Sequence, residues 1–161
     1  MMTDDTTPLL QHSYTFVLDR INGVTLNLRT ANLPTLSIGQ RFTPTRDADI
    51  TMPGDKIGFE DLTLEFIVDD KMINYTQISD WIWEGANPKT GIKAKSVSDY
   101  LSDGVLSVYN AHEQIVKQFR FEGCYPTSLG GIVFDNTSQD STPITANVTL
   151  AYSIFSEEGK Y

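Results

Sequence analysis

Few residues of this 161-residue chain have the types and spacing that catalysis or metal binding requires. The two histidines, His12 and His112, lie far apart, and neither belongs to a His-Glu-x-x-His or Cys-x-x-Cys pattern. The single cysteine, Cys124, cannot form an internal disulfide and has no adjacent basic residue that would activate its thiol. Asp-Ala-Asp at 47–49 lacks the downstream glycine and glutamate of an EF-hand loop. The sequence therefore predicts no metal site and no cofactor.

Paired carboxylates are the remaining candidates for acid–base chemistry. They occur at Asp4/Asp5, Asp69/Asp70 and Glu157/Glu158. Adjacent residues of a strand point to opposite faces, and two of these pairs lie near the ends of the chain, so a solvated surface or a helix cap explains them better. Gly-x-Ser-x-Gly and phosphate-binding glycine loops are absent from the sequence. We predict no catalytic residues and conclude that the chain is not an enzyme.

Composition narrows the function further. The chain carries 21 Asp and Glu against 12 Lys and Arg, a formal net charge of −9. Proteins that grip nucleic acid phosphates or anionic membranes use clustered basic residues, so this balance argues against both. Hydrophobic residues make up 40% of the chain, which is enough for one folded domain. The sequence has no secretory leader with a basic and an apolar part, and no apolar run of about 18 residues. We therefore expect a soluble domain that is intracellular at birth.

The hydrophobic pattern alternates with a period of two along most of the chain, which is typical of β-strands. We expect a flexible arm over residues 1–11, one β domain over 12–155 and a charged, frayed tail over 156–161. Alternation on either side of Ile21-Asn22-Gly23 predicts a first β-hairpin over residues 14–29.

Residues 32–55 carry a weaker signal. Three prolines in this stretch disfavour central strands, because proline lacks the N–H that a ladder needs. Two interpretations remain open: short edge strands around 36–42 and 48–52, or a loop ordered by another subunit. Pro53-Gly54-Asp55 is predicted to form a turn.

A strand and the main helix follow this stretch. Leu62, Leu64, Phe66 and Val68 alternate with polar residues and predict a strand with one buried face. Apolar residues at helical spacing then predict an amphipathic helix over 71–84, with Asp69 or Asp70 as its N-cap and Gly85 at its end.

The second half of the chain predicts more antiparallel strands. A polar loop over 86–103 precedes a hairpin of strands 104–110 and 113–124, and Cys124-Tyr125-Pro126-Thr127 is expected to break the second strand. The clearest alternation, over 144–154, predicts the last strand. The fold class is therefore mainly β (α+β): an antiparallel β-sandwich or barrel of roughly seven strands with one flanking helix.

Acidic residues gather around the predicted strand 62–68. Asp61, Glu65 and Asp69 recur every fourth residue, which places them on one face of an extended chain, about 13 Å apart. An ordinary solvated sheet face explains such a row equally well.

The order of several motifs resembles the tube proteins of contractile phage tails and related injection machines. The motifs are Leu33-Pro34, Gly54-Asp55 followed by Phe59-Glu60-Asp61-Leu62-Thr63-Leu64, Asp80-Trp81, and Gly123-Cys124-Tyr125-Pro126-Thr127-Ser128-Leu129-Gly130 ahead of Asp135. Each motif alone is too short to identify a family. The resemblance rests on their order and spacing, which extend over about residues 12–155.

The resemblance implies a structural virion protein that forms stacked hexameric rings of an inner tail tube, through which genomic DNA passes at ejection. The implied partners are other copies of the chain and the sheath and baseplate proteins, with no membrane, and the implied location is the phage tail after assembly in the host cytoplasm. Because such lumens tend to be acidic, Asp61, Glu65 and Asp69 become candidates for the lumen. The implied inter-subunit contacts include Leu33, Pro34, Pro53, Gly54 and Asp55, within residues 32–55.

Two further interpretations stay open. A tube-initiating baseplate protein or a secreted ring protein of the same fold would carry the same motifs. A small β-sandwich that binds carbohydrate or protein would expose an aromatic patch near Trp81 and Trp83. The helical spacing places Trp81 beside the apolar stripe and Trp83 away from it, so we expect burial of Trp81 only.

Overall fold

The computed structural model describes residues 14–21, 26–44, 48–86, 96–110, 112–135 and 142–158. The flexible N-terminal segment predicted over residues 1–11 lies outside these residues. The described elements are β1 (Tyr14–Leu18), β2 (Leu28–Asn32), β3 (Leu36–Pro44), β4 (Asp49–Phe59), β5 (Leu62–Ile67), α1 (Ile73–Gly85), α2 (Val97–Tyr100), β6 (Ser102–Tyr109), β7 (Ile115–Leu129), β8 (Thr145–Ala151) and β9 (Ile154–Glu157).

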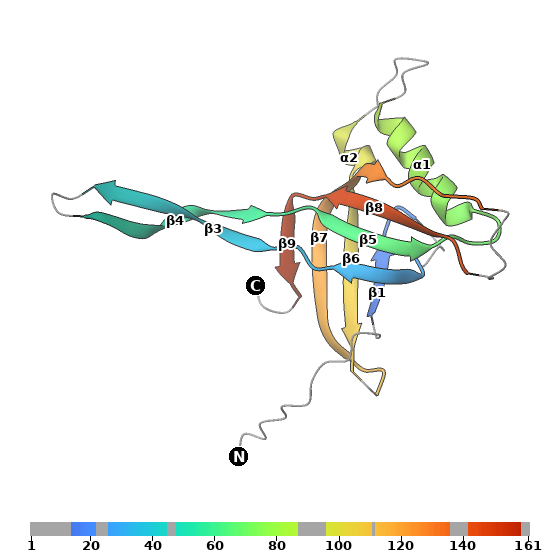
Figure 1. Cartoon of the computed structure of the whole chain (residues 1–161), viewed down its shortest axis with the longest axis horizontal. Helices are drawn as coiled ribbons and strands as arrows, with labels where there is room; N and C mark the ends of the chain where they lie inside the picture. Colours follow the sequence, from blue (N-terminus) through green and yellow to red (C-terminus); the bar gives the residue numbers. More distant parts are fainter. Residues whose placement is uncertain are drawn as a thin grey trace.

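Two groups of antiparallel strands share the long strand β7. Its first part pairs with β6 on one side and β9 on the other, and β6 pairs with β1. Its last part, from Tyr125, pairs with β8, which continues to β5 and β2. The two groups run nearly crosswise in Figure 1, and an isolated bridge between Phe16 and Leu26 links the chain ahead of β2 to β1. The strands thus form the predicted barrel-like antiparallel domain.

One apolar core fills the space between the strand groups and α1. Phe16, Phe66 and Phe121 are fully buried at its centre, and the helix contributes Ile78 and Trp81. The indole Nε1 of Trp81 donates a hydrogen bond to the carbonyl of Tyr100 at 2.8 Å, which ties α1 to α2. Trp81 is 2% exposed whereas Trp83 is 45% exposed, so the expected difference between the two tryptophans is confirmed.

The helix α1 is confirmed, but its predicted N-cap is wrong. Neither Asp69 nor Asp70 caps it; Met72 occupies the cap position with a left-handed φ of 54° and no side-chain hydrogen bond. The connection is held instead by the buried Asn74, whose Oδ1 accepts hydrogen bonds from the backbone N–H groups of Asp69 and Tyr75. Its Nδ2 donates to the carbonyl of Ile67 at the end of β5.

Strands β3 and β4 form a two-stranded hairpin, which we call the arm, that projects away from the barrel (Figure 1). The prediction of strands in residues 32–55 is therefore confirmed, but they are longer than the short edge strands expected around 36–42 and 48–52, and they form a sheet of their own. The turn predicted at Pro53-Gly54-Asp55 is wrong, since these residues lie inside β4. The register shifts between Ile38 and Gln40, and the backbones approach so closely there that a Cβ on Gly54 would lie 2.6 Å from the carbonyl oxygen of Gly39. Glycine is thus required by close approach rather than by a turn.

Four other expectations differ from the structure. β1 pairs with β6, and β2 with β5, so the described residues within 14–29 share an isolated bridge instead of the expected hairpin. β7 runs through Cys124–Thr127 to Leu129 instead of breaking, and the expected tail contributes Ser156 and Glu157 to β9. With β9 and the short α2, the described residues hold nine strands and two helices rather than about seven and one.

The hairpin of β6 and β7 and the strand β8 are confirmed. Among the described residues, none of the helices has the length and apolar character needed to cross a membrane.

Candidate functional site

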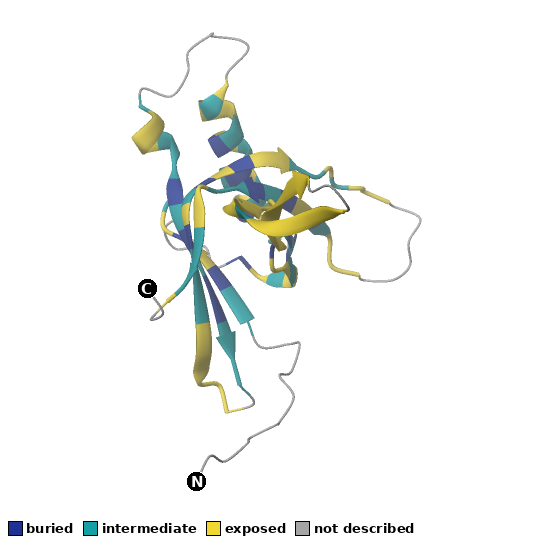
Figure 2. Cartoon of the chain, turned by 90° about the vertical axis from the view of Figure 1, so that its left-hand side faces the viewer, coloured by how far each residue is buried: buried dark blue, intermediate teal, exposed yellow. Residues whose placement is uncertain are grey.

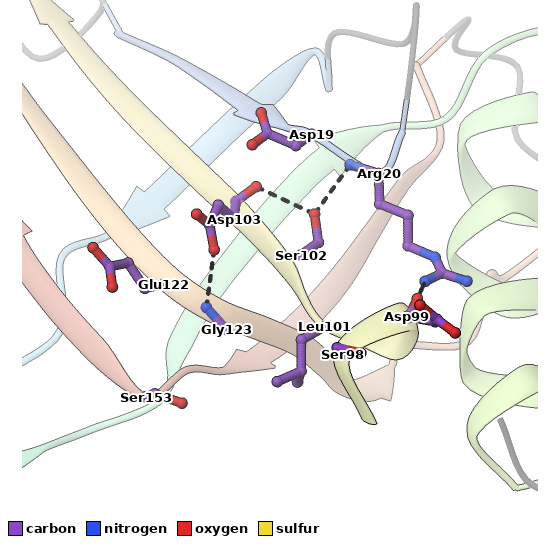
Figure 3. Close-up of a pocket in the computed structure, with 10 residues that line it drawn as sticks. All are labelled: Asp19, Arg20, Ser98, Asp99, Leu101, Ser102, Asp103, Glu122, Gly123 and Ser153. Carbon is purple, nitrogen blue, oxygen red and sulfur yellow. Dashed lines mark hydrogen bonds between the residues drawn. The ribbon is translucent and has the colours of Figure 1, made fainter. Parts of the chain in front are cut away.

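A cleft of about 660 Å³ lies between the end of β1, α2 and the middle of β7 (Figure 3). Its polar lining makes it a candidate for a catalytic or binding site. It is lined by Asp19, Arg20, Ser98, Asp99, Leu101, Ser102, Asp103, Glu122, Gly123 and Ser153. Four carboxylates and three hydroxyls thus face one cleft, and their partners decide whether any of them can react.

Ser102 and Arg20 of this cleft link neighbouring elements of the fold. The Ser102 hydroxyl donates a hydrogen bond to the carbonyl of Asp103 and accepts one from the backbone N–H of Arg20. The Arg20 guanidinium lies 5.5 Å from the Trp81 ring centre and also pairs with Glu84, so it joins the end of β1 to α1. None of the lining residues is a histidine that could activate a serine, and the described part of the chain has no group of three or more metal-binding side chains.

Cys124 is also unreactive in this setting. Burial, reinforced by the nearby carboxylate of Asp103, raises the pKa of its thiol to about 12. Because the thiolate is the nucleophile, a thiol protonated at neutral pH supplies no nucleophilic catalysis.

Asp103 carries a pH-dependent part of the stability. The Arg120 guanidinium at 3.0 Å and the backbone N–H of Gly123 at 3.2 Å lower the pKa of its carboxyl group. Because the pKa of Asp103 is lower in the folded state, its carboxylate stabilises the fold fully when the pH is above the pKa of the unfolded state, about 4. This stabilisation is lost as the pH falls through the lower pKa of the folded state. The side chain is 34% exposed, so solvent screening reduces the contribution to about 1 kcal/mol or less.

We therefore expect Asp103→Asn to lower the free energy of unfolding by about 1 kcal/mol at pH 7 and by less at pH 3. Urea unfolding at several pH values measures this difference. Glu113→Gln, at an exposed position in the β6–β7 turn, is the control. An equal loss at both pH values would contradict the assignment.

The apolar arm is the most unusual surface among the residues that the structure describes. Its strands expose large apolar side chains, at positions Leu36, Ile38, Phe42, Ile50, Met52, Ile57 and Phe59. Two of the cross-strand pairs, Leu36 with Phe59 and Ile38 with Ile57, stand directly opposite each other and share one face of the ribbon. Figure 2 shows the arm as an almost uniformly exposed ribbon. Exposed apolar surface of this kind marks a protein interaction site.

An apolar groove of about 470 Å³ lies at the base of the arm. Leu36, Ile57 and Phe59 line it from the arm, and Phe119 and Phe155 line it from β7 and β9. Leu33 and Pro34, two of the predicted contact residues, also belong to this groove, whereas Pro53, Gly54 and Asp55 lie farther along β4. The sequence did not single out Phe119 and Phe155, because only the pairing of β7 with β9 brings them together.

The predicted acidic row follows β5 but is not uniform. Glu65 lies on the strand, on the face opposite the buried Leu64 and Phe66, whereas Asp61 precedes β5 and Asp69 follows it. Glu65 also has a basic partner that the sequence did not reveal: Arg29 Nη1 lies 3.5 Å from its Oε1.

Comparison with known proteins adds independent observations. No family model matches the sequence. A tail tube protein of Serratia phage KSP90 is 26% identical over 132 residues, which cover 80% of this chain and 72% of that protein. Among solved structures, a chain of the anti-feeding prophage baseplate superposes with a TM-score of 0.70 at 11% identity, over 96% of this chain and 97% of that one.

A chain of the sheath–tube complex of the PVC extracellular contractile injection system gives a TM-score of 0.68 at 18% identity, over 96% and 93% of the two chains. Hcp1 from Flavobacterium johnsoniae gives 0.54 at 12% identity, over 91% and 95%. The chain has the tail tube fold. The resemblance indicated by the sequence is confirmed, and the relatives of this tail-tube-like chain are structural proteins and not enzymes, in line with the absence of catalytic motifs.

Proposed function

We propose that this chain is the repeating subunit of the inner tail tube of a contractile phage tail. The supporting observations are its similarity to the tail tube protein of Serratia phage KSP90 and its fold, which chains of contractile injection systems share. A structural role also agrees with the hydrogen bonds by which Ser102 and Asp103 of the cleft link neighbouring elements of the fold.

The apolar arm is the observation that carries the proposal. It projects away from the barrel, so its apolar side chains contact another copy rather than their own core (Figure 1). The far end of the arm, which carries the exposed Phe42, Ile50 and Met52, could fill the groove of another copy, and that groove lies at the base of the arm. An interface between two different patches is heterologous, and heterologous contacts generate closed rings or open filaments rather than isolated dimers.

Stacked hexameric rings satisfy this requirement and are the arrangement we propose. Leu33, Pro34, Pro53, Gly54 and Asp55 then lie at contacts between subunits, on or beside the arm. The sheath surrounds the tube, the baseplate starts it, and genomic DNA passes through it without specific binding. Asp61, Glu65 and Asp69 face the lumen in this arrangement. The protein is then part of the virion tail, after assembly in the host cytoplasm.

Negative-stain electron microscopy of the purified chain tests the proposal. We expect sixfold rings or tubes about 90 Å wide, an estimate for β-domains about 25–30 Å deep around a pore. Analytical ultracentrifugation should show the corresponding large species. A chain that stays monomeric at millimolar concentration would exclude the tube and leave a binding module as the alternative.

A further inference from the structure

The outward face of β2, β5, β8 and the end of β7 is rich in neutral polar groups. We call it the polar face, and its residues are Thr30, Asn32, Thr63, Glu65, Ser128, Asn147 and Thr149. They form two rows across the strands: Asn32, Thr63, Thr149 and Ser128 stand opposite one another in the first, and Thr30, Glu65 and Asn147 in the second. None of them is buried. Six of the seven side chains are hydroxyls or amides, and only Glu65 carries a charge.

The charge of Glu65 is balanced within the face. Arg29 Nη1 lies 3.5 Å from Oε1, and the Thr30 hydroxyl donates a hydrogen bond to Oε2 at 3.2 Å. The register shift between Leu28 and Thr30 lets both residues reach Glu65 from the neighbouring strand. The middle of β5 therefore has no net charge, although the sequence places a carboxylate there.

The other two carboxylates of the row flank this neutral stretch. Asp61 and Asp69 lie before and after β5, about 26 Å apart for an extended chain. The screening length at physiological salt is about 8 Å, so two charges at this distance act on a passing molecule separately.

We propose that the polar face is a neutral band of hydroxyl and amide groups between two acidic levels, and that Arg29 is the residue that makes the band neutral. The inference rests on the proposed function, since it describes what a tube with this face inward would present to its cargo. A passing polyanion meets repulsion at the levels of Asp61 and Asp69. Between them it meets hydrogen-bonding groups that are hydrated and carry no charge to hold it.

Thiol labelling of assembled tubes measures the local potential on this face. Thr63→Cys places a thiol in the first row, two residues from Glu65 along β5. Cys124 does not react because its thiol is buried and protonated. The rate at which a cationic methanethiosulfonate labels this thiol is divided by the rate for an anionic one. The same ratio is measured for 2-mercaptoethanol, a free thiol that serves as the reference. We expect agreement within about threefold.

Removing the basic partner should unmask the carboxylate. Arg29→Gln is expected to raise the cation-to-anion ratio about fivefold, and adding Glu65→Gln should return it to the starting value. Lys117→Gln is the matched control, because Lys117 lies 3.5 Å from Glu157 on β7 and β9, away from the polar face. It should leave the ratio unchanged. Thr149→Cys, directly opposite Thr63, replaces the first probe if that variant does not fold.

The possible results separate the two proposals. Failure to form tubes would refute the proposed function, and the Arg29 effect would still test the neutral band on the free chain. Tubes in which the Thr63 thiol favours the cationic reagent more than tenfold with Arg29 present would overturn the neutral band alone. An unchanged ratio in Arg29→Gln would overturn the role of Arg29.

Discussion

Replacing Ile38 and Ile57 together with threonine is expected to abolish tube assembly and leave the barrel folded. These side chains stand opposite each other on the arm and are 57% and 61% exposed in the single chain. Burial of an isoleucine stabilises an interface by about 1.5–3 kcal/mol, so losing two per contact weakens association by about 3–6 kcal/mol, or at least a hundredfold. Threonine keeps the β-branched shape that a strand favours.

Sedimentation velocity and electron microscopy measure the assembly, and urea unfolding measures the fold. Because neither side chain belongs to the core, the free energy of unfolding should change by no more than about 0.5 kcal/mol. Val97→Thr is the control, because Val97 is 74% exposed and lies on α2, away from the arm. This variant should assemble normally. Normal tubes from the double variant would show that the arm is not the interface.

The elements with one clearly buried face were predictable from the sequence. In β5 and β8 every second residue, from Leu62 to Phe66 and from Ala146 to Leu150, is buried, as their alternation indicates. Ile78 and Trp81 of α1 follow the helical period in the same way. Such patterns are reliable because shifting a strand by one residue would exchange its buried and exposed faces.

Pairing between distant strands was not predictable. Two alternating runs close in sequence suggested a hairpin, but β1 pairs with β6 and β2 with β5, and this places Phe16 and Phe66 in different strand groups. Pro126 also misled the prediction for β7. The strand changes partner from β6 to β8 next to this residue, with a register shift after it, and a missing N–H is tolerated at such an irregularity.

The candidate contact and lumen residues were only partly recoverable for the same reason. The spacing of Asp61, Glu65 and Asp69 was visible in the sequence, but the pairing of Glu65 with Arg29 depends on a register shift that no local pattern encodes. The groove at the base of the arm joins Leu36 and Ile57 to Phe119, which lies far along the chain. Sequence periodicity identifies faces, whereas grooves arise from strand order.

Asn74→Ala should produce the largest loss of stability of any single change considered, because Asn74 is fully buried between β5 and α1. Its amide makes three hydrogen bonds, with the N–H groups of Asp69 and Tyr75 and with the carbonyl of Ile67. Truncation leaves these backbone groups without their partner in a buried site, at about 1–3 kcal/mol for each unsatisfied group. Partial relaxation brings the expected total to about 3–5 kcal/mol, a large part of the stability of a domain this size.

Asn74→Asp separates the hydrogen bonds from simple packing. The aspartate keeps the volume and the acceptor for Asp69 and Tyr75, but when ionised it faces the Ile67 carbonyl with a carboxylate oxygen instead of a donor. Burial and this repulsion raise the folded-state pKa of the new group, so the variant binds more protons when folded and becomes more stable as the pH falls. Urea unfolding at pH 4.5 and pH 8 measures the effect, with the exposed Asn32→Asp as control. A variant as stable at pH 8 as at pH 4.5 would mean that the Asn74 side chain only fills space, and that its hydrogen bonds do not stabilise the connection between β5 and α1.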